Sequence, residues 1–404
     1  MASNRRTYVN KRRTSRPVER VQVRGNKRKK KAETQHRLGE FDFTFLFLVF
    51  VLLAFGLIML LSASTPSANT KIGDSYYFFL RQLCGVGVGA AGMVFMAAVD
   101  YHRYKKMIPI AMVVCMILLV CVRIPGIGVD RNGAWRWLKT PFIQLQPSEF
   151  MKPVIALFFA KMISERKYRV DNLMGMVPYL AILGVVGILM IIEPHLSGAI
   201  VICGIGVMVM IVGGAKLRYF VGAACVVGPI GFIWLRNDAV RWGRVLSFID
   251  PFRDMTGKSY QITQSLIALG SGGLFGRGLG QSVQKYTFLP EPYNDFIFAV
   301  VCEELGFVGA IIIVALFAAL IIRGLKIAFE APDTFGMLTV VGIISHIAIQ
   351  TAFNIAVVCS AIPTTGISLP FFSFGGTAIM VLLIEIGIVL NVSRQSTKIN
   401  SVPQ

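Results

Sequence analysis

Long apolar stretches recur along this chain, and they constrain its fold more than any other feature. Of its 404 residues, 55% are hydrophobic and only 15% are charged, which is more apolar surface than a water-soluble domain can bury. A helix needs about 20 mostly apolar residues to cross a bilayer. Such stretches lie at 43–65, 80–98, 107–122, 147–163, 173–192, 196–213, 218–235, 296–322, 335–358 and 373–392. We therefore predict an all-α polytopic membrane protein with about ten transmembrane helices.

The first 39 residues are strongly basic. They contain 14 Lys and Arg residues against Glu19 and Glu33, which gives +12 of the net charge of +20. We expect 1–39 to be a disordered cytoplasmic tail that orients the protein and contacts anionic lipid. Docking of another protein is the alternative, whereas nucleic-acid binding lacks a folded reader or interleaved aromatic side chains. No cleavage site precedes the first span, which predicts an uncleaved signal anchor.

The short loops predict the orientation of the chain. With the tail in the cytoplasm, every second loop should be basic by the positive-inside rule. Each one is, through Arg103, Lys105 and Lys106, then Lys161, Arg166, Lys167 and Arg169, then Lys216 and Arg218, then Arg323 and Lys326, and finally Arg394 and Lys398. Both termini are then cytoplasmic, and 123–146, 193–195, 236–294 and 359–373 lie outside. The predicted units are a membrane domain over 40–394, with a large extracytoplasmic loop at 236–294 between helices 7 and 8, and a cytoplasmic tail over 395–404.

Two of the predicted outer loops are themselves basic. Their cations are Arg131, Arg136 and Lys139 in one loop, and Arg236, Arg241, Arg244, Arg253, Lys258, Arg277 and Lys285 in the other. Positive charge on this side suggests an anionic ligand there. The alternative is that long loops cross the membrane whatever their charge.

Cysteine and histidine point to neither a disulfide framework nor a metal site. The seven cysteines are odd in number and lie mostly within predicted spans, and the four histidines are isolated from one another.

Asp295 stands at the predicted outer boundary of the membrane, just where an apolar helix begins. A carboxylate there is costly unless it has a function. Ala299, Cys302, Gly306 and Gly309 share its helix face and predict that another helix packs closely against it. Partial desolvation would raise the pKa of Asp295 toward the range of a general base. A carboxylate that only compensates the helix dipole is the alternative.

Glu149 and Lys152 are three residues apart in the segment 146–153 and so share a helix face. Pro153 cannot donate to the carbonyl of Glu149, which loosens the helix at this point. Two interpretations are equally open for Lys152. It forms an ion pair with Glu149, or it meets a phosphate at the outer end of the helix.

The large outer loop contains a predicted interfacial helix that begins at Tyr260, followed by five glycines within 271–280. The glycine-rich segment has no Gly-Lys-Ser/Thr ending and is therefore not an ATP-type P-loop. It is either an anion-binding nest completed by Arg277 or a flexible hinge.

Polar residues recur every fourth position in the ninth predicted span, at His346, Gln350 and Asn354, and the tenth span carries Glu385. We interpret this stripe as hydrogen bonding between helices, with a water-filled path as the alternative. The apolar but turn-rich connection 363–377 is expected to fold back into the outer leaflet under a cover of protein.

Together, several sequence motifs of this chain resemble those of the SEDS family of shape, elongation, division and sporulation proteins. The resemblance rests on Gln146-Pro147-Ser148-Glu149 with Lys152, Tyr260-Gln261-Ile262-Thr263-Gln264-Ser265, Leu289-Pro290-Glu291 with Asp295-Phe296-Ile297-Phe298, Glu303-Glu304-Leu305-Gly306, and Pro363-Thr364-Thr365-Gly366 through Gly375-Gly376. The segment 362–370 is closer to the FtsW and SpoVE branch than to RodA. The turn Glu193-Pro194-His195 departs from the pattern common in the family.

The resemblance implies a GT-C-like fold and a peptidoglycan glycosyltransferase of the bacterial plasma membrane. Such an enzyme polymerises lipid II on the outer face and works with a class B penicillin-binding protein and other division or sporulation proteins. It implies Asp295 and Lys152 as catalytic residues. We expect the substrates, lipid II and the undecaprenyl-pyrophosphate-linked glycan, to meet Ser148, Glu149, Arg136, Arg244, Arg253, Gln264, Ser265, Arg277, Glu291 and Thr365. Asp295 would deprotonate the acceptor hydroxyl, while the cations, with or without Mg²⁺ or Mn²⁺, offset the charge of the leaving pyrophosphate.

Two other functions compete with this interpretation. A lipid II flippase or proton-coupled transporter would use Glu149, Glu303, Glu304 and Glu385 as an intramembrane relay. A scaffold for division proteins would account for the basic tail but not for Asp295.

Overall fold

Helices occupy all ten of the predicted apolar stretches. The computed structural model describes residues 39–399 except 132–133, 140–144, 166–169, 255–256 and 258, so the predicted tail lies almost wholly outside the described residues. The ten helices are α1 (Phe43–Ile72), α2 (Tyr77–Ala98), α4 (Ile108–Cys121), α5 (Pro147–Ser164), α6 (Leu173–Ile192), α7 (Leu196–Val212), α8 (Leu217–Asn237), α12 (Ile297–Phe329), α13 (Thr334–Val358) and α14 (Gly376–Ile399). Seven helices in the described ranges are long and apolar enough to cross a membrane, while α4 and α7 are shorter apolar helices. The all-α polytopic membrane fold is confirmed, and the number of ten spans stays a prediction.

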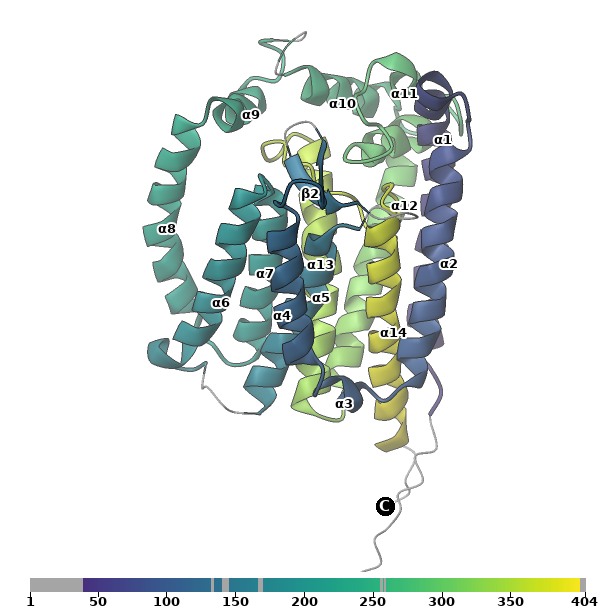
Figure 1. Ribbon diagram of the computed structural model, residues 1–404. Helices are drawn as coiled ribbons and strands as arrows, with labels where there is room; N and C mark the ends of the chain where they lie inside the picture. The colour runs from purple at the N-terminus through teal and green to yellow at the C-terminus, as the bar shows by residue number, and fades with distance from the viewer. Residues whose placement is uncertain are drawn as a thin grey trace, which may run out of the picture. The chain divides into compact units, whose positions relative to one another are not determined.

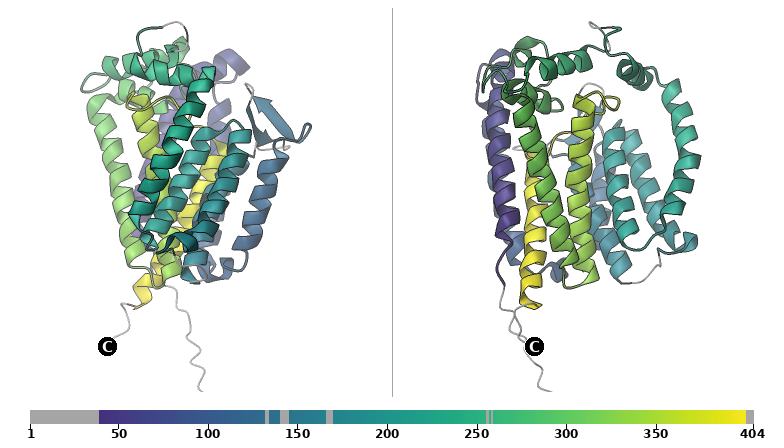
Figure 2. Two further views of the ribbon diagram at one scale, coloured as in Figure 1. Left: turned by 90° about the vertical axis from the view of Figure 1, so that its left-hand side faces the viewer. Right: turned by 180° about the vertical axis from the view of Figure 1, so that it is seen from behind.

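The centre of the bundle is α13, which packs against α5, α7 and α12. On one side of this centre, helices α2 and α14 pack closely against each other (Figure 2). A Cβ at Gly89 would lie 2.9 Å from the Cα of Met380, and one at Gly387 would lie 2.4 Å from the carbonyl oxygen of Met93. Small residues let the two backbones approach, as they commonly do between membrane helices.

Helix α8 differs from the other long helices because none of its residues is buried. It stands at the edge of the bundle and connects at its end to α9 (Ala239–Ile249) (Figure 1). Its exposed apolar side chains therefore face the surroundings rather than the protein core.

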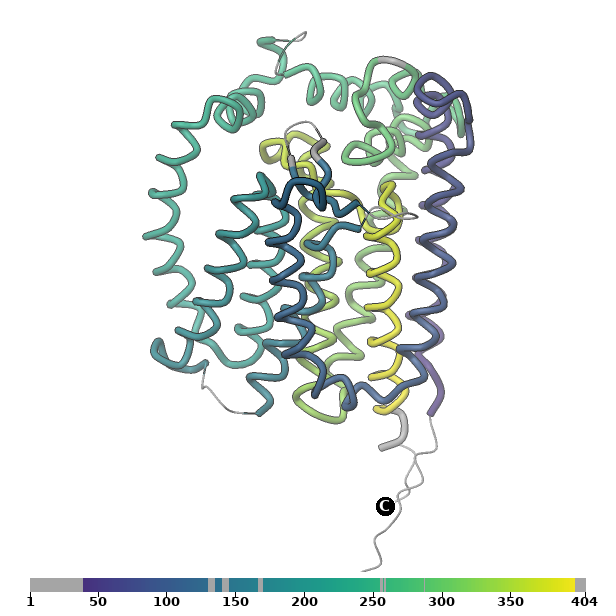
Figure 3. The backbone as a smooth tube through the Cα atoms, in the orientation of Figure 1, coloured from purple at the N-terminus to yellow at the C-terminus, as the bar shows by residue number. Residues whose placement is uncertain are grey.

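The predicted outer loops gather at one end of the bundle. This end carries α9, α10 (Tyr260–Ser271), α11 (Gln284–Thr287) and a small β-hairpin, whereas α3 (Tyr101–Tyr104) lies at the other end (Figures 1 and 3). The helix expected to begin at Tyr260 is confirmed as α10.

The hairpin was not predicted. Its strands β1 (Gly128–Arg131) and β2 (Ala134–Leu138) are antiparallel, with Val129 opposite Trp137. The β-prone tryptophans of this short segment favour a strand, but two strands of four and five residues give too weak a pattern to separate from a loop.

The prediction that another helix packs on the small-residue face of α12 is wrong at Gly306. This residue breaks the helix, with φ 69° and ψ −171°, and its neighbour is the glycine-rich segment. A Cβ at Gly306 would lie 2.2 Å from the nitrogen of Gly276. The amides of Arg277 and Phe307 bond across this junction to the carbonyls of Glu303 and Gly273, at 3.0 and 2.9 Å. The break in the helix is thus closed by backbone hydrogen bonds from the loop.

Candidate active site

Asp295 is half-buried in the turn that precedes α12. Its main-chain oxygen accepts a hydrogen bond from Nδ2 of Asn354, at 2.8 Å, and the same Nδ2 donates to the carbonyl of Ile367 at 2.7 Å. The carboxylate faces the loop 363–375, because a Cβ at Gly366 would lie 3.2 Å from Oδ2 of Asp295. One side chain of α13 thus holds the main chain at Asp295 and this loop together.

The charges around Asp295 act in both directions on its acidity. The pKa of Asp295 is raised to about 6, because burial and the nearby carboxylate of Glu291 raise it more than the cations Arg136 and Arg244 lower it. A carboxyl group with a pKa near 6 is a stronger base than an ordinary aspartate and is still ionised at neutral pH. Its electrostatic surroundings therefore suit proton abstraction.

Arg136 and Arg244 reach this region from two different segments of the predicted outer loops. Arg136, on β2, donates through Nη2 to the carbonyl of Pro194. Arg244, on α9, is exposed and donates through Nη1 to the carbonyl of Thr364 at 3.3 Å. Ser197 donates to the carbonyl of the neighbouring Thr365. Arg244 and Ser197 thus contact the loop 363–375 directly, whereas Arg136 contacts the turn that precedes Ser197.

Lys152 forms the ion pair that the sequence predicted as one of two possibilities. Its ammonium lies 2.7 and 2.8 Å from the two carboxylate oxygens of Glu149 and 3.1 Å from Oε1 of Gln350. Both charged side chains are buried, at 5% and 9% exposure. An ammonium group has three N–H donors, and all three have acceptors here. A direct contact with a phosphate would require one of these bonds to open.

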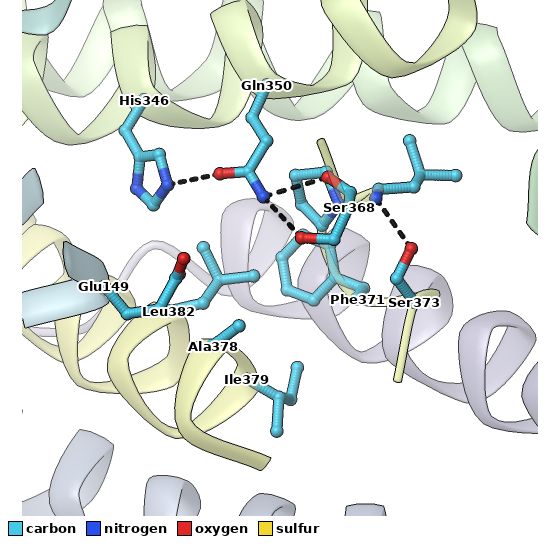
Figure 4. Close-up of a pocket in the computed structure, with 11 residues that line it drawn as sticks. Glu149, His346, Gln350, Ser368, Phe371, Ser373, Ala378, Ile379 and Leu382 are labelled. Atoms are coloured by element: carbon cyan, nitrogen blue, oxygen red, sulfur yellow. Dashed lines mark hydrogen bonds between the residues drawn. The ribbon is translucent and has the colours of Figure 1, made fainter. Parts of the chain in front are cut away.

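The polar stripe of α13 connects Lys152 to the loop beside Asp295. Gln350 donates through Nε2 to the main-chain oxygen and to Oγ of Ser368, at 2.9 and 3.0 Å. Gln350 and Ser368 line a small pocket together with Glu149, His346 and Phe371 (Figure 4). The predicted role of the stripe as hydrogen bonding between segments agrees with these contacts.

The remaining predicted substrate residues lie in several places. Glu291 is exposed and pairs with Lys71 at 3.5 Å. Ser265 is buried and donates to the carbonyl of Val358 at 2.9 Å, and Gln264 beside it is half-buried. Arg277 pairs with Glu303 at 3.8 Å.

Three further predicted residues complete this placement. Ser148 is buried and accepts from Nε2 of Gln146 at 3.0 Å. Arg253 is exposed. The hydroxyl of Thr365 is buried and has no hydrogen-bond partner among the described residues. The structure thus brings Arg136, Arg244 and Thr365 to the region of Asp295, whereas Arg277 belongs to a separate cluster.

Glu193 and His195 were not predicted as site residues. Both lie buried in the turn between α6 and α7, and neither carboxylate oxygen of Glu193 has a hydrogen-bond partner among the described residues. Burial raises the pKa of Glu193 to about 8, against the opposing charges of Arg136 and Arg123. The sequence did contain one indication of Glu193 as a site residue, namely an acidic residue at the predicted end of a span. It could not be separated from ordinary capping without the contact of Arg136 with this turn.

Glu303 and Glu304 do not form part of an open path. Glu304 accepts from Lys285 at 2.7 Å and from Ser62 at 2.7 Å. Glu303 accepts from the hydroxyl of Ser282 at 2.5 Å and from the amide of Val283 at 3.0 Å. Both carboxylates, which lie on α12, thus hold the segment around α11 against that helix. This favours a structural role over a proton relay.

The described residues offer no cluster of three or more His, Cys, Asp or Glu side chains that would hold a metal ion. Mg²⁺ or Mn²⁺ therefore stays a prediction, and no step below depends on it.

Comparison with known proteins decides the family. The model of the FtsW/RodA/SpoVE family of cell cycle proteins matches residues 43–398. The chain belongs to this family. Stage V sporulation protein E of Bacillus subtilis is 43% identical over 357 residues, which cover 88% of this chain and 97% of that protein. The probable peptidoglycan glycosyltransferase FtsW of Trichlorobacter lovleyi is 38% identical over 358 residues, which cover 88% and 94% of the two chains.

Solved structures show the same fold. A chain of a peptidoglycan synthase complex, studied for the coordination of polymerization and crosslinking, superposes with a TM-score of 0.74 at 24% identity, covering 88% of this chain and 98% of that one. RodA of Thermus thermophilus gives a TM-score of 0.66 at 24% identity, covering 88% and 97%. At this identity the likeness concerns the fold alone, and it agrees with an all-α polytopic membrane protein.

Proposed function

We propose that this FtsW/RodA/SpoVE protein is a peptidoglycan glycosyltransferase that polymerises lipid II. The observation that carries the proposal is Asp295. It is a half-buried carboxylate with a pKa raised to about 6, held beside the loop 363–375 and within the field of Arg136 and Arg244. The family and the name of the relative from Trichlorobacter lovleyi support the same reaction.

In the proposed reaction, Asp295 removes the proton from the acceptor 4-hydroxyl. The resulting oxygen bonds to the anomeric carbon of the donor as the bond from that carbon to the pyrophosphate breaks. The electron pair leaves with undecaprenyl pyrophosphate. Arg136 on β2 and Arg244 on α9 are placed to offset the negative charge that develops on this group, because the charges of both cations act at Asp295. Lys152 stays paired with Glu149 and is linked to the loop through Gln350.

We place the reaction on the outer face of the bacterial plasma membrane. Support comes from the gathering of α9, α10, α11 and the β-hairpin, which belong to the predicted outer segments, at one end of the bundle (Figure 1). The positive-inside pattern puts this end away from the cytoplasm. We further propose a class B penicillin-binding protein as the partner, since a solved neighbour is part of a peptidoglycan synthase complex.

The test is polymerisation of lipid II by the purified full-length chain in detergent, alone and with a class B penicillin-binding protein. Asp295→Asn keeps the shape of the side chain but removes the base, so the rate should fall by about 10²- to 10⁴-fold. Asp250→Asn, at an exposed aspartate before the turn that precedes α10, is the control and should retain the rate. Near-normal glycan strands from Asp295→Asn would overturn the mechanism.

The same assay separates the enzyme from a transporter. No gradient exists in detergent, so a flippase or proton-coupled carrier would form no polymer there, whereas a glycosyltransferase would. Lys152→Ala should also lower the rate, because it leaves the buried carboxylate of Glu149 without its cation.

A further inference from the structure

The hydrogen bonds around Gln350 define which atoms of the network carry protons. Nε2 of Gln350 faces the main-chain oxygen of Ser368 at 2.9 Å (Figure 4). A carbonyl oxygen only accepts, so this contact fixes the orientation of the amide. Oε1 of Gln350 must then accept from its two other neighbours, the ammonium of Lys152 at 3.1 Å and Nε2 of His346 at 2.7 Å. His346 therefore carries a proton on Nε2.

The opposite nitrogen of His346 faces Glu385. Nδ1 lies 2.8 Å from Oε2 of Glu385, and both side chains are buried, at 4% and 0% exposure. A hydrogen bond across this contact needs one proton, on either the nitrogen or the oxygen. The pair is neutral overall in both cases, either as imidazole with carboxylic acid or as imidazolium with carboxylate. In both cases Nε2–H still points at Gln350.

We infer that His346 is a positioning residue for glycosyl transfer, which donates to Gln350 and so holds Lys152 and the loop beside Asp295 in one arrangement. Glu385 on α14 fixes the ring of His346 by the hydrogen bond to Nδ1, much as a carboxylate orients a histidine at other functional sites. Gln350 in turn bonds to two groups, the ammonium of Lys152 on α5 and the main-chain oxygen of Ser368 in the loop 363–375. The inference rests on the proposed function.

Alternative readings of the network make different predictions. If the stripe served only as helix packing, the direction of each hydrogen bond would not matter, and any side chain of similar size would replace His346. If His346 positions Gln350, the donor at the place of Nε2 is essential. Two substitutions separate these cases, because the terminal nitrogen of glutamine reaches the place of Nε2 and that of asparagine only the place of Nδ1.

The experiment measures kcat and KM for lipid II polymerisation by the full-length chain with its class B partner. His346→Asn should lower kcat about tenfold or more with KM nearly unchanged, the magnitude common for groups that orient a site. His346→Gln should recover most of the loss. Thr339→Val is the matched control, because Thr339 is buried on the same helix and its hydroxyl has no partner among the described residues. It should leave kcat unchanged.

A second measurement asks whether His346 acts through Gln350. In a Gln350→Ala background, His346→Asn should add little to the loss, whereas independent roles would multiply the two effects. Equal activity of His346→Asn and the wild type would overturn the inference, as would multiplied losses. If the wild-type chain forms no glycan strands, the proposed function fails by itself. In that case, ¹⁵N NMR of labelled histidine measures whether Nε2 of His346 carries a proton, and the spectrum of His346→Asn assigns the signal. An unprotonated Nε2 would overturn the inference.

Discussion

The side-chain amide of Asn354 binds the main-chain oxygen of Asp295 at 2.8 Å across 59 positions of sequence. The same nitrogen binds Ile367 at 2.7 Å in the loop 363–375. A polar residue near the C-terminal end of α13 thus sets where the candidate base stands relative to the loop that faces it.

Asn354→Ala should therefore lower polymerisation by about 10- to 100-fold, because a displacement of the base by about 1 Å is enough for such a loss. The measurement is the initial rate with lipid II. Thr351→Val on the same helix is the control, since Thr351 is buried and its hydroxyl has no partner within the described part of the chain. Equal rates for the two variants would contradict the positioning role of Asn354.

The acidic limb of the pH–rate profile should report Asp295. Only the carboxylate can act as a base, so kcat/KM should fall about tenfold per pH unit below the pKa of about 6 and level off above it. A profile that is flat between about pH 5 and pH 7 would show that this carboxylate does not carry the proton transfer.

Two neighbours of Asp295 should move this limb in opposite directions. Glu291 raises the pKa of Asp295, so Glu291→Gln should shift the limb to lower pH. Arg136 lowers that pKa, so Arg136→Gln should shift the limb to higher pH. The midpoints, not the plateau rates, are the quantities to compare. Shifts of the same sign would contradict the electrostatic arrangement described above.

The buried ion pair of Lys285 with Glu304 should matter far more for stability than the exposed pair of Lys71 with Glu291. The first pair has side chains 3% and 0% exposed, and the second 55% and 44%. Lys285→Met leaves a buried charge without its cation and should cost about 3–5 kcal/mol, whereas Lys71→Met should cost about 0–1 kcal/mol. Thermal unfolding in detergent measures both. Similar melting temperatures would contradict the structural role of Glu304.

Gly306→Ala should destabilise the protein strongly, because φ is 69° and the new Cβ would lie 2.2 Å from the nitrogen of Gly276. Gly184→Ala in α6 is the matched control. No atom lies within 4 Å of its Cβ position, so alanine there should be neutral or stabilise the helix by up to about 1 kcal/mol. The yield of folded protein and its melting temperature compare the two.

Much of the fold could be predicted from local sequence. Apolar stretches of spanning length form helices because lipid offers no hydrogen-bond partners, so each segment must satisfy its own backbone. Asp295 could be identified by the same logic, since a carboxylate at the start of an apolar helix needs a reason to be there. The hairpin and the break at Gly306 escaped prediction, because both depend on what packs beside them.

The sequence by itself determined the helices, the charge pattern that predicts their orientation, and Asp295 as the candidate base. Only the tertiary structure decided which cations accompany that base and which do not. Arg244 reaches the loop at Thr364 across 120 positions, whereas Arg277, in the same predicted outer loop as Arg244, pairs with Glu303. Lys152, Gln350, His346 and Glu385 come from three different helices. Their hydrogen bonds follow from the packing of those helices and could not be predicted from the spacing of these residues along the chain.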